Sequence, residues 1–298
     1  MNRRNLLRSA IALTAATMSR PTKARTALIS RKIPSSGEQI PVIGLGTSRT
    51  FEVGVSAAER EPLRAVLEAF FAGGARLIDT SPMYSTAERV LGELLTPEMH
   101  ARAFLATKVW TRGARAGIEQ MTHSEQQLLA KPLDLIQVHN LLDLGTQLAT
   151  LREWQAAGRV RYVGVTHYTV SGQADLERVV SHERLDFVQL NYSPVTRAAE
   201  QRLLPLAAER GVAVLVNRPF EDGGIFGRLR GKPLPAFAAD LDATSWGQLI
   251  LKFIAAHPAV TCIIPATASV AHLEDNLAAG RGRLPDERQR ELIVAALG

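Results

Sequence analysis

Short apolar segments alternate along this chain with longer stretches in which apolar residues recur at helical spacing. The first pattern is typical of strands buried on both faces of a parallel sheet, and the second of helices that cover such a sheet. The pattern predicts strands at Val42–Leu45, Arg76–Ile78, Ala103–Ala106, Leu133–Val138, Val160–Val165, Phe187–Leu190, Val212–Val216 and Thr261–Ile264. It predicts helices near residues 57–72, 86–95, 117–130, 145–157, 170–181, 198–210, 244–257 and 269–280. Eight such strand–helix units predict an α/β fold that closes into a (β/α)8 TIM barrel.

The length of 298 residues fits one barrel of about 250 residues better than two small domains. We expect an N-terminal β-hairpin ahead of the barrel, with Arg31–Pro34 and Gln39–Pro41 joined by a turn at residues 35–37. The alternative α/β design, a doubly wound sheet, would carry G-x-G-x-x-G after its first strand. The corresponding segment here, residues 44–49, reads GLGTSR and lacks the third glycine, so the barrel is favoured.

A long connection runs from Pro219 to Thr244, after the seventh predicted strand, and it contains four glycines. Loops of this length in a compact domain are usually functional or disordered. The connection begins on the side of a barrel where active sites form. We therefore predict that it is a flexible cover over a ligand.

The first 24 residues differ in charge from the rest of the chain. They hold no acidic residue and five basic ones: Arg3, Arg4, Arg8, Arg20 and Lys23. The paired arginines, a weak apolar run over residues 10–18 and the small residue Ala24 resemble a twin-arginine (Tat) export signal. We expect residues 1–24 to be an export signal that engages the Tat machinery, and residues 25–298 to form the barrel in the periplasm or outside the cell. The alternative is a basic N-terminus on a cytoplasmic protein.

The rest of the chain argues against several classes of protein. Residues 25–298 hold 30 basic and 29 acidic residues, and so balanced a charge gives no sign of the basic patch that nucleic-acid binding needs. No apolar run reaches the roughly 20 residues of a membrane-spanning helix, so we expect no stable membrane insertion. Cys262 lies in an apolar segment and is expected in the core. No H-x-x-x-H or C-x-x-C pair occurs, and we expect no metal site.

Polar residues end three successive predicted strands. Asp79, Lys108 and His139 close the second, third and fourth strands, and Tyr84 lies five residues past Asp79. Because neighbouring strands are about 4.8 Å apart, Asp79 and Lys108 can form an ion pair at the mouth of the barrel, with His139 one strand further on. An ammonium group beside Tyr84 is expected to lower the pKa of the phenol from about 10. A phenol so tuned is a useful acid or base near neutral pH.

These segments resemble the aldo/keto reductase superfamily. Further segments that carry the resemblance are Ile43–Thr47, Val163–Tyr168, Gln189–Tyr192 and the stretch from Ile264 to Asn276. The resemblance extends from about residue 32 to the C-terminus. It implies an NAD(P)-dependent oxidoreductase of the carbonyl reductase or alcohol dehydrogenase type, acting on an aldehyde or ketone. The catalytic tetrad that it implies is Asp79, Tyr84, Lys108 and His139. In this tetrad Tyr84 is the general acid, Lys108 and Asp79 tune it, and His139 orients the carbonyl oxygen.

The resemblance also implies a nicotinamide site at the strand ends. Thr166, His167 and Gln189 stand where the family holds the carboxamide, although the family usually has Ser-Asn in place of Thr166-His167. A hydroxyl and an imidazole can make the same kinds of hydrogen bond, so we expect binding to be retained. Thr47, in the segment after the first strand, and the tetrad residue Asp79 belong to the same expected site.

The seventh strand departs from the family pattern, because it ends in Asn217 and Arg218 where the family often has an aromatic residue that stacks on the nicotinamide. Asn217 offers no such face. Arg218 can stack through its planar guanidinium or reach a phosphate. The alternative interpretation of Arg218 is a solvated surface arginine.

The segment after the eighth strand bears on the choice between NADP and NAD. Where NADP-preferring relatives grip the 2′-phosphate with Lys and Arg, this chain has Ala266 and His272. Thr267 and Ser269 can still cap the following helix and bond a phosphate there, and Asn276 stands where the family bonds adenine. The family habit favours NADP, and the loss of two cations keeps NAD open.

Trp110, just beyond Lys108, is expected to line the substrate pocket, with a packing role as the alternative. A second function stays open for the whole chain: a nucleotide-binding or regulatory protein that keeps the barrel but turns over little. Asn217 and the missing phosphate clamp favour that second function. The intact tetrad argues against it, because a retired site has no need of a buried Lys–Asp pair.

Overall fold

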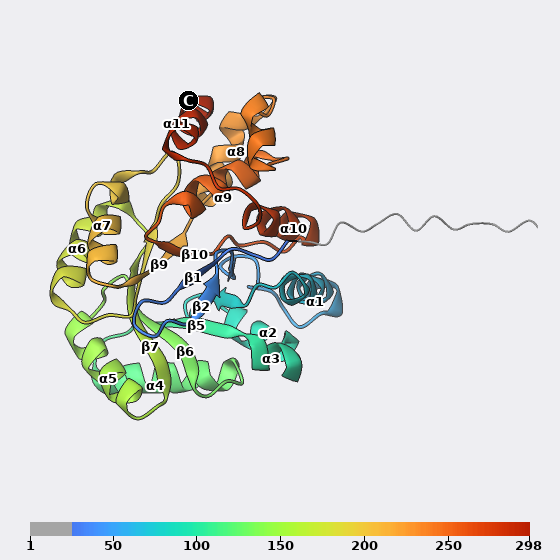
Figure 1. The fold of residues 1–298 in the computed structure, drawn as a ribbon. Coiled ribbons are helices and arrows are strands. Elements are labelled where there is room, and N and C mark those ends of the chain that lie inside the picture. Colours follow the sequence, from blue (N-terminus) through green and yellow to red (C-terminus); the bar gives the residue numbers. More distant parts are fainter. Residues whose placement is uncertain (1–25) are drawn as a thin grey trace, which may run out of the picture.

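The computed structural model describes residues 26–298, so the expected export signal at residues 1–24 lies outside the described residues. Eight parallel strands follow one another around the sheet in chain order (Figure 1). Bridges from Ile43 to Ile263 and from Gly46 to Ala266 join its two edges and close the barrel. The predicted TIM barrel is confirmed. Its strands are β3 (Leu45–Gly46), β4 (Leu77–Asp79), β5 (Phe104–Val109), β6 (Leu133–His139), β7 (Val160–His167), β8 (Phe187–Asn191), β9 (Ala213–Asn217) and β10 (Val260–Ile263).

Helices surround the barrel (Figure 1), and eight of them occupy the predicted places. These are α1 (Ala57–Ala72), α2 (Ala87–Leu94), α4 (Ala114–Gln127), α5 (Leu144–Ala156), α6 (Gln173–His182), α7 (Leu203–Glu209), α9 (Trp246–Ala256) and α10 (Val270–Ala279). Three further helices, α3 (Pro97–Arg102), α8 (Gly224–Leu229) and α11 (Glu287–Leu297), were not predicted. Two of the three have only six residues, too few for an amphipathic period to show.

The connection from Pro219 to Thr244 is more ordered than a plain loop, since it contains α8 and short 3₁₀ segments. Its first part, up to Gly223, lines the large pocket described below. The start of the connection therefore lines a cavity, and its role as a cover over a ligand stays a prediction. Its flexibility stays a prediction.

The N-terminal hairpin closes the end of the barrel at which the strands begin. Its strands β1 (Ser30–Lys32) and β2 (Gln39–Pro41) pair antiparallel, and Gly37 takes the positive φ of 76° that the turn requires. Ile33 and Ile40 are fully buried in one cluster with residues of the barrel interior such as Phe104 and Phe187. Cys262 belongs to the same cluster, which confirms the expected core thiol.

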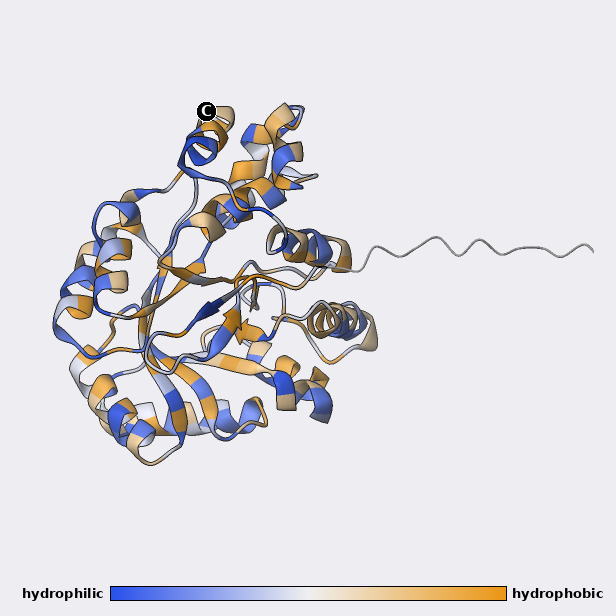
Figure 2. Ribbon diagram, in the orientation of Figure 1, coloured by the Kyte–Doolittle hydropathy of each residue, from blue (hydrophilic) through white to orange (hydrophobic). Residues whose placement is uncertain are grey.

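Apolar residues run along most of the strands, whereas the surrounding helices carry both polar and apolar residues (Figure 2). The exceptions gather near the ends of the strands, where Asp79, Lys108, Gln137 and Gln189 are all buried. Burying such groups is costly unless they are paired, so this cluster marks the place to look for chemistry. In residues 26–298 no helix is long and apolar enough to cross a membrane.

Candidate active site

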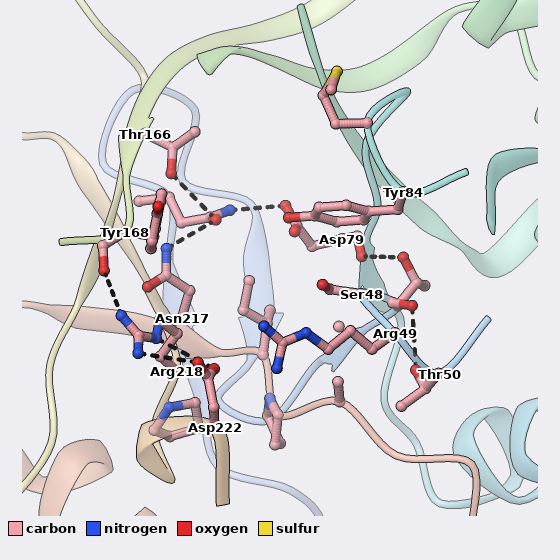
Figure 3. Close-up of a pocket in the computed structure, with 18 of the residues that line it drawn as sticks. Ser48, Arg49, Thr50, Asp79, Tyr84, Thr166, Tyr168, Asn217, Arg218 and Asp222 are labelled. Atoms are coloured by element: carbon pink, nitrogen blue, oxygen red, sulfur yellow. Dashed lines mark hydrogen bonds and ion pairs between the residues drawn. The ribbon is translucent and has the colours of Figure 1, made fainter. Parts of the chain in front are cut away.

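A pocket of about 640 Å³ opens at the C-terminal ends of the barrel strands (Figure 3). Nine of the residues singled out in the sequence line it: Thr47, Asp79, Tyr84, Trp110, His139, Thr166, Gln189, Asn217 and Arg218. They come from widely separated parts of the chain, and closure of the barrel brings them together. The opening lies on the face where TIM barrels place their active sites.

An ion pair between Asp79 and Lys108 is buried beneath the pocket. Asp79 ends β4 and Lys108 lies near the end of β5. Lys108 Nζ donates to Asp79 Oδ2 at 2.6 Å and to the Thr80 carbonyl oxygen at 2.7 Å. Burial by itself would lower the pKa of Lys108, but the charge of Asp79 and its hydrogen bond raise it overall, so the ammonium form persists. The expected ion pair is present.

Tyr84 lies above this pair, in the loop between β4 and α2. Lys108 Nζ is 4.9 Å from the centroid of its ring. The prediction that Lys108 lowers the pKa of Tyr84 is wrong in net sign. Burial raises the pKa of the phenol above its ordinary value, the charge of Lys108 offsets only part of that rise, and the charge of Asp79 adds to it. The phenol stays protonated at neutral pH, as a proton donor must.

His139 ends β6 and faces the same space. Its Nδ1 lies 3.3 Å from Ser81 Oγ, and Ser81 Oγ accepts from the Met83 amide at 3.2 Å. The serine hydroxyl can donate to Nδ1 or accept from it, so either ring nitrogen can carry the proton of the neutral imidazole. Burial, and then the charge of Lys108, lower the pKa of His139 to about 3, so the ring is neutral across the physiological range. The ring centroid is 6.3 Å from that of Tyr84 and 6.4 Å from that of Trp110.

Hydrogen-bonded amides form the floor of the pocket next to Asp79. Gln189 Nε2 donates to Asp79 Oδ1 at 2.8 Å. Gln189 Oε1 accepts from Thr166 Oγ1 at 3.2 Å and from Asn217 Nδ2 at 3.1 Å (Figure 3). Thr47 is held at the edge of the floor, since its hydroxyl donates to the Asp79 carbonyl oxygen at 3.1 Å.

This floor fits the carboxamide of a nicotinamide. Asn217 Oδ1 is buried and has no hydrogen-bond partner, and an unpaired buried acceptor costs free energy until a donor reaches it. A carboxamide NH₂ is such a donor. Asn217 therefore suits the polar end of the nicotinamide, although it offers no stacking face.

Two arginines reach the pocket from different sides (Figure 3). The Arg218 guanidinium pairs with Asp222 at 3.0 Å and donates to the Tyr168 carbonyl oxygen at 3.3 Å. Arg49 extends into the pocket from the loop after β3 (Figure 3). Two guanidinium groups at one pocket suit an anionic ligand such as the diphosphate of a dinucleotide. Arg218 is thus part of the pocket wall rather than a remote surface residue.

The structure does not bring every expected residue into the pocket. The His167 ring packs against Thr169 and Gly172, with Nδ1 3.2 Å from Thr169 Oγ1, and it does not line the pocket. We therefore leave His167 out of the proposed carboxamide site. The physical reason is that successive side chains of a strand point to opposite faces, and Thr166 is the one that faces the pocket floor.

The residues expected at the adenosine end also lie outside the pocket. Ser269 caps α10, as anticipated, and Thr267 Oγ1 accepts from the Ser269 amide at 3.1 Å. His272 is exposed on the first turn of α10, while Asn276 is buried. These residues follow in the chain the pocket wall formed by Ile264–Ala266, but they do not line the cavity, and their contact with a nucleotide stays a prediction.

Sequence analysis missed several residues that the structure joins to the site: Arg49, Met83 and Tyr168 line the pocket, and three others bond to the expected residues. Gln137 donates to Asp79 Oδ1 at 3.2 Å, Ser81 holds His139, and Asp222 pairs with Arg218. A glutamine inside the apolar run Leu135–Val138 was an available signal for the first. Ser81 and Asp222 stand in loops with no periodic pattern. Among residues 26–298 no cluster of His, Cys, Asp or Glu has the arrangement of a metal site.

The chain is similar to known proteins both in sequence and in fold. A model described as the aldo/keto reductase family matches residues 42–293. The methylglyoxal reductase YeaE of Escherichia coli is 29% identical over 262 residues, covering 83% of this chain and 88% of that protein. Pyridoxine 4-dehydrogenase of Escherichia coli is 26% identical over 272 residues, covering 82% and 91%. A solved aldo-keto reductase from Klebsiella pneumoniae, in complex with NADPH, superposes with a TM-score of 0.72 at 27% identity, covering 90% of this chain and 93% of that one.

Proposed function

The chain belongs to the aldo/keto reductase family, and from that premise we propose that it passes a hydride between NADPH and an aldehyde or ketone, with Tyr84 as proton donor. The observation that carries the proposal is the buried ammonium of Lys108, bonded to Asp79 at 2.6 Å and 4.9 Å from the Tyr84 ring at the pocket floor. A buried lysine needs partners that offset the cost of its burial, and those of Lys108 stand beside a phenol at the pocket.

The chemistry that the dinucleotide supplies when bound is a hydride equivalent for the carbonyl carbon. Tyr84 Oη gives its proton to the carbonyl oxygen as negative charge develops there. The ammonium of Lys108 stabilises the phenolate that remains, and Asp79 keeps that ammonium charged. His139 is neutral, and in the tautomer that carries the proton on Nε2 it donates a hydrogen bond that orients the carbonyl oxygen while Nδ1 accepts from Ser81.

Thr166, Gln189 and Asn217 would hold the nicotinamide carboxamide, and Arg218 with Arg49 would face the diphosphate. The NADPH complex of the Klebsiella pneumoniae relative supports NADP as the cofactor. Ala266 and His272, in place of a phosphate clamp, keep NAD as the alternative. Met83, Trp110 and Tyr168 are exposed around the pocket, so we propose that the substrate presents an apolar group beside its carbonyl.

The test is oxidation of NADPH or NADH in the presence of a panel of aldehydes and ketones, together with the dissociation constant of each nucleotide. We expect Tyr84→Phe to lower kcat by at least about 100-fold with little change in nucleotide affinity, since a general acid contributes that much. The matched control is Tyr162→Phe, because Tyr162 is bonded to Ser36 and Glu38 at the other end of the barrel. Nucleotide binding without turnover on any carbonyl would instead support the regulatory alternative.

We also propose that residues 1–24 direct export by the Tat route, a hypothesis supported by Arg3-Arg4 and the short apolar run after them. Expression of the full chain with Arg3→Lys and Arg4→Lys tests this hypothesis. We expect the substitutions to retain the protein in the cytoplasm, uncleaved, while the unmodified chain appears outside the cytoplasm without its leader. Equal distribution of both forms would show a cytoplasmic protein with a basic N-terminus.

A further inference from the structure

Gln137 lies near the end of β6 with its side chain fully buried inside the barrel. Its Nε2 donates to Asp79 Oδ1 at 3.2 Å, and its Oε1 accepts from Gln189 Nε2 at 3.3 Å. We propose that Gln137 is a positioning residue for the reaction, which holds the Asp79 carboxylate in the orientation that serves Lys108. The inference rests on the proposed function, because its effect reaches the substrate through the proton donor Tyr84.

Packing alone does not account for a glutamine at this position. Leu135, two residues earlier and on the same face of the strand, is fully buried and apolar in the barrel interior. An apolar side chain of similar volume would fill the same space without the cost of burying an amide. The amide is tolerated here because both of its ends are bonded, one of them to a charged group.

The neighbouring strand is shaped to admit this side chain. Gln137 is in register with Gly164 on β7. A Cβ at Gly164 would lie 3.2 Å from Gln137 Cγ and 2.7 Å from the Phe187 carbonyl oxygen. A larger residue at position 164 would therefore push against Gln137 and the neighbouring strand, so Gly164 leaves the room that the glutamine occupies.

The two oxygens of Asp79 have separate partners. Oδ2 accepts from Lys108 at 2.6 Å, and Oδ1 accepts from Gln189 at 2.8 Å and from Gln137. A carboxylate bonded on both oxygens is fixed in rotation, so its charge stays directed at the ammonium. Every member of this network is buried, and a fully bonded buried network keeps its geometry better than isolated pairs do.

Removing the Gln137 donor leaves Asp79 with one partner fewer. The carboxylate keeps its bonds to Lys108 and Gln189, but it shares less of its negative charge and holds the Lys108 proton more tightly, so less net positive charge faces Tyr84. The phenol becomes harder to ionise and a weaker proton donor. We expect Gln137→Met to lower kcat by roughly tenfold, the equivalent of one weakened charge-assisted hydrogen bond, with KM for the carbonyl changed by less than about twofold.

A direct readout of the phenol separates this role from a purely structural one. The near-ultraviolet absorbance of phenolate is followed against pH for each protein and for the same protein carrying Tyr84→Phe, and the difference reports Tyr84 alone. We expect its titration to move upward by roughly half a pH unit in Gln137→Met.

The matched control is Gln155→Met. Gln155 Nε2 donates to Asp186 Oδ2 at 2.9 Å near the start of β8, so the control removes a glutamine–aspartate bond that does not touch the tetrad. We expect unchanged kcat and an unchanged Tyr84 titration. Should Gln137→Met fail to fold, Gln137→Leu, which also removes the donor and is apolar like Leu135 on the same face of the strand, provides the same measurement.

The outcomes distinguish this inference from the proposed function. An upward shift of the Tyr84 titration in the Gln137 variants, absent in the control, supports the positioning role even if no carbonyl is reduced. Failure of every carbonyl in the unsubstituted protein overturns the proposed function alone. Folded Gln137 variants with an unchanged Tyr84 titration and unchanged kcat overturn the positioning role.

Discussion

The substitution Lys108→Met removes the cation from a buried ion pair and leaves its carboxylate behind. Lys108 and Asp79 are 1% and 3% exposed, and their charged atoms are 2.6 Å apart. At that distance the attraction is about 6 kcal/mol for an effective dielectric constant of about 20. Much of this only offsets the cost of burial, so the whole amount is not lost from the free energy of unfolding when Lys108 is removed.

The size of the loss is limited because Asp79 can take up a proton. At pH 7, protonating a carboxyl whose ordinary pKa is about 3.9 costs about 4 kcal/mol. This cost is close to the loss of roughly 3–5 kcal/mol that is typical when one partner of a buried ion pair is removed. At pH 5 the same protonation costs only about 1.5 kcal/mol. A lone buried carboxyl has a raised folded-state pKa, so its penalty grows as pH rises. We therefore expect Lys108→Met to lose about 4 kcal/mol at pH 7 and less than half of that at pH 5.

Urea unfolding of the unsubstituted protein and the variant at both pH values measures this difference. Lys252→Met is the matched control, because Lys252 is also fully buried but bonds the carbonyl oxygens of Arg281 and Arg283 instead of a carboxylate. Its deficit is expected to be the same at both pH values. A Lys108→Met deficit that does not shrink on acidification would refute the reasoning that an uncompensated Asp79 charge causes it.

Further predictions concern His139 and the C-terminal helix. The pKa of His139 is lowered to about 3, so nitrogen NMR should find its ring neutral at pH 5. For the same reason, the pH profile of kcat should show no change due to this residue between pH 5 and 8. A titration of His139 near pH 6.5 would contradict the burial argument. Arg290 on α11 bonds Tyr192 Oη at 2.7 Å and Glu200, and its guanidinium lies 4.5 Å from the Phe253 ring centroid. Arg290→Met should therefore lower the free energy of unfolding, measured in urea, by about 2 kcal/mol and leave kcat unchanged. A stable but inactive variant would show instead that α11 contributes to the site.

Much of the fold follows from the sequence because strand and helix periodicities are local. The eight apolar segments predicted the eight barrel strands, and Asp79, Lys108 and His139 fell at the ends of neighbouring strands. Those positions were enough to predict an ion pair, since adjacent parallel strands bring their ends side by side. The helices that escaped prediction were short or, like α11, began at a capping box, Asp286 with Gln289, that was not used.

Other properties were decided only when the barrel closed. The sign of the pKa shift of Tyr84 depends on how much water the surrounding chain removes, and no spacing in the sequence reports desolvation. Asp79 and Gln189 are 110 residues apart, yet their hydrogen bond joins the ion pair to the pocket floor. The contact of the His167 ring with Thr169 and Gly172 likewise depends on the fold of the turn after the strand. The sequence thus determined which groups stand at the strand ends, and the tertiary structure determined which of them meet, because contact and burial depend on all eight strands together.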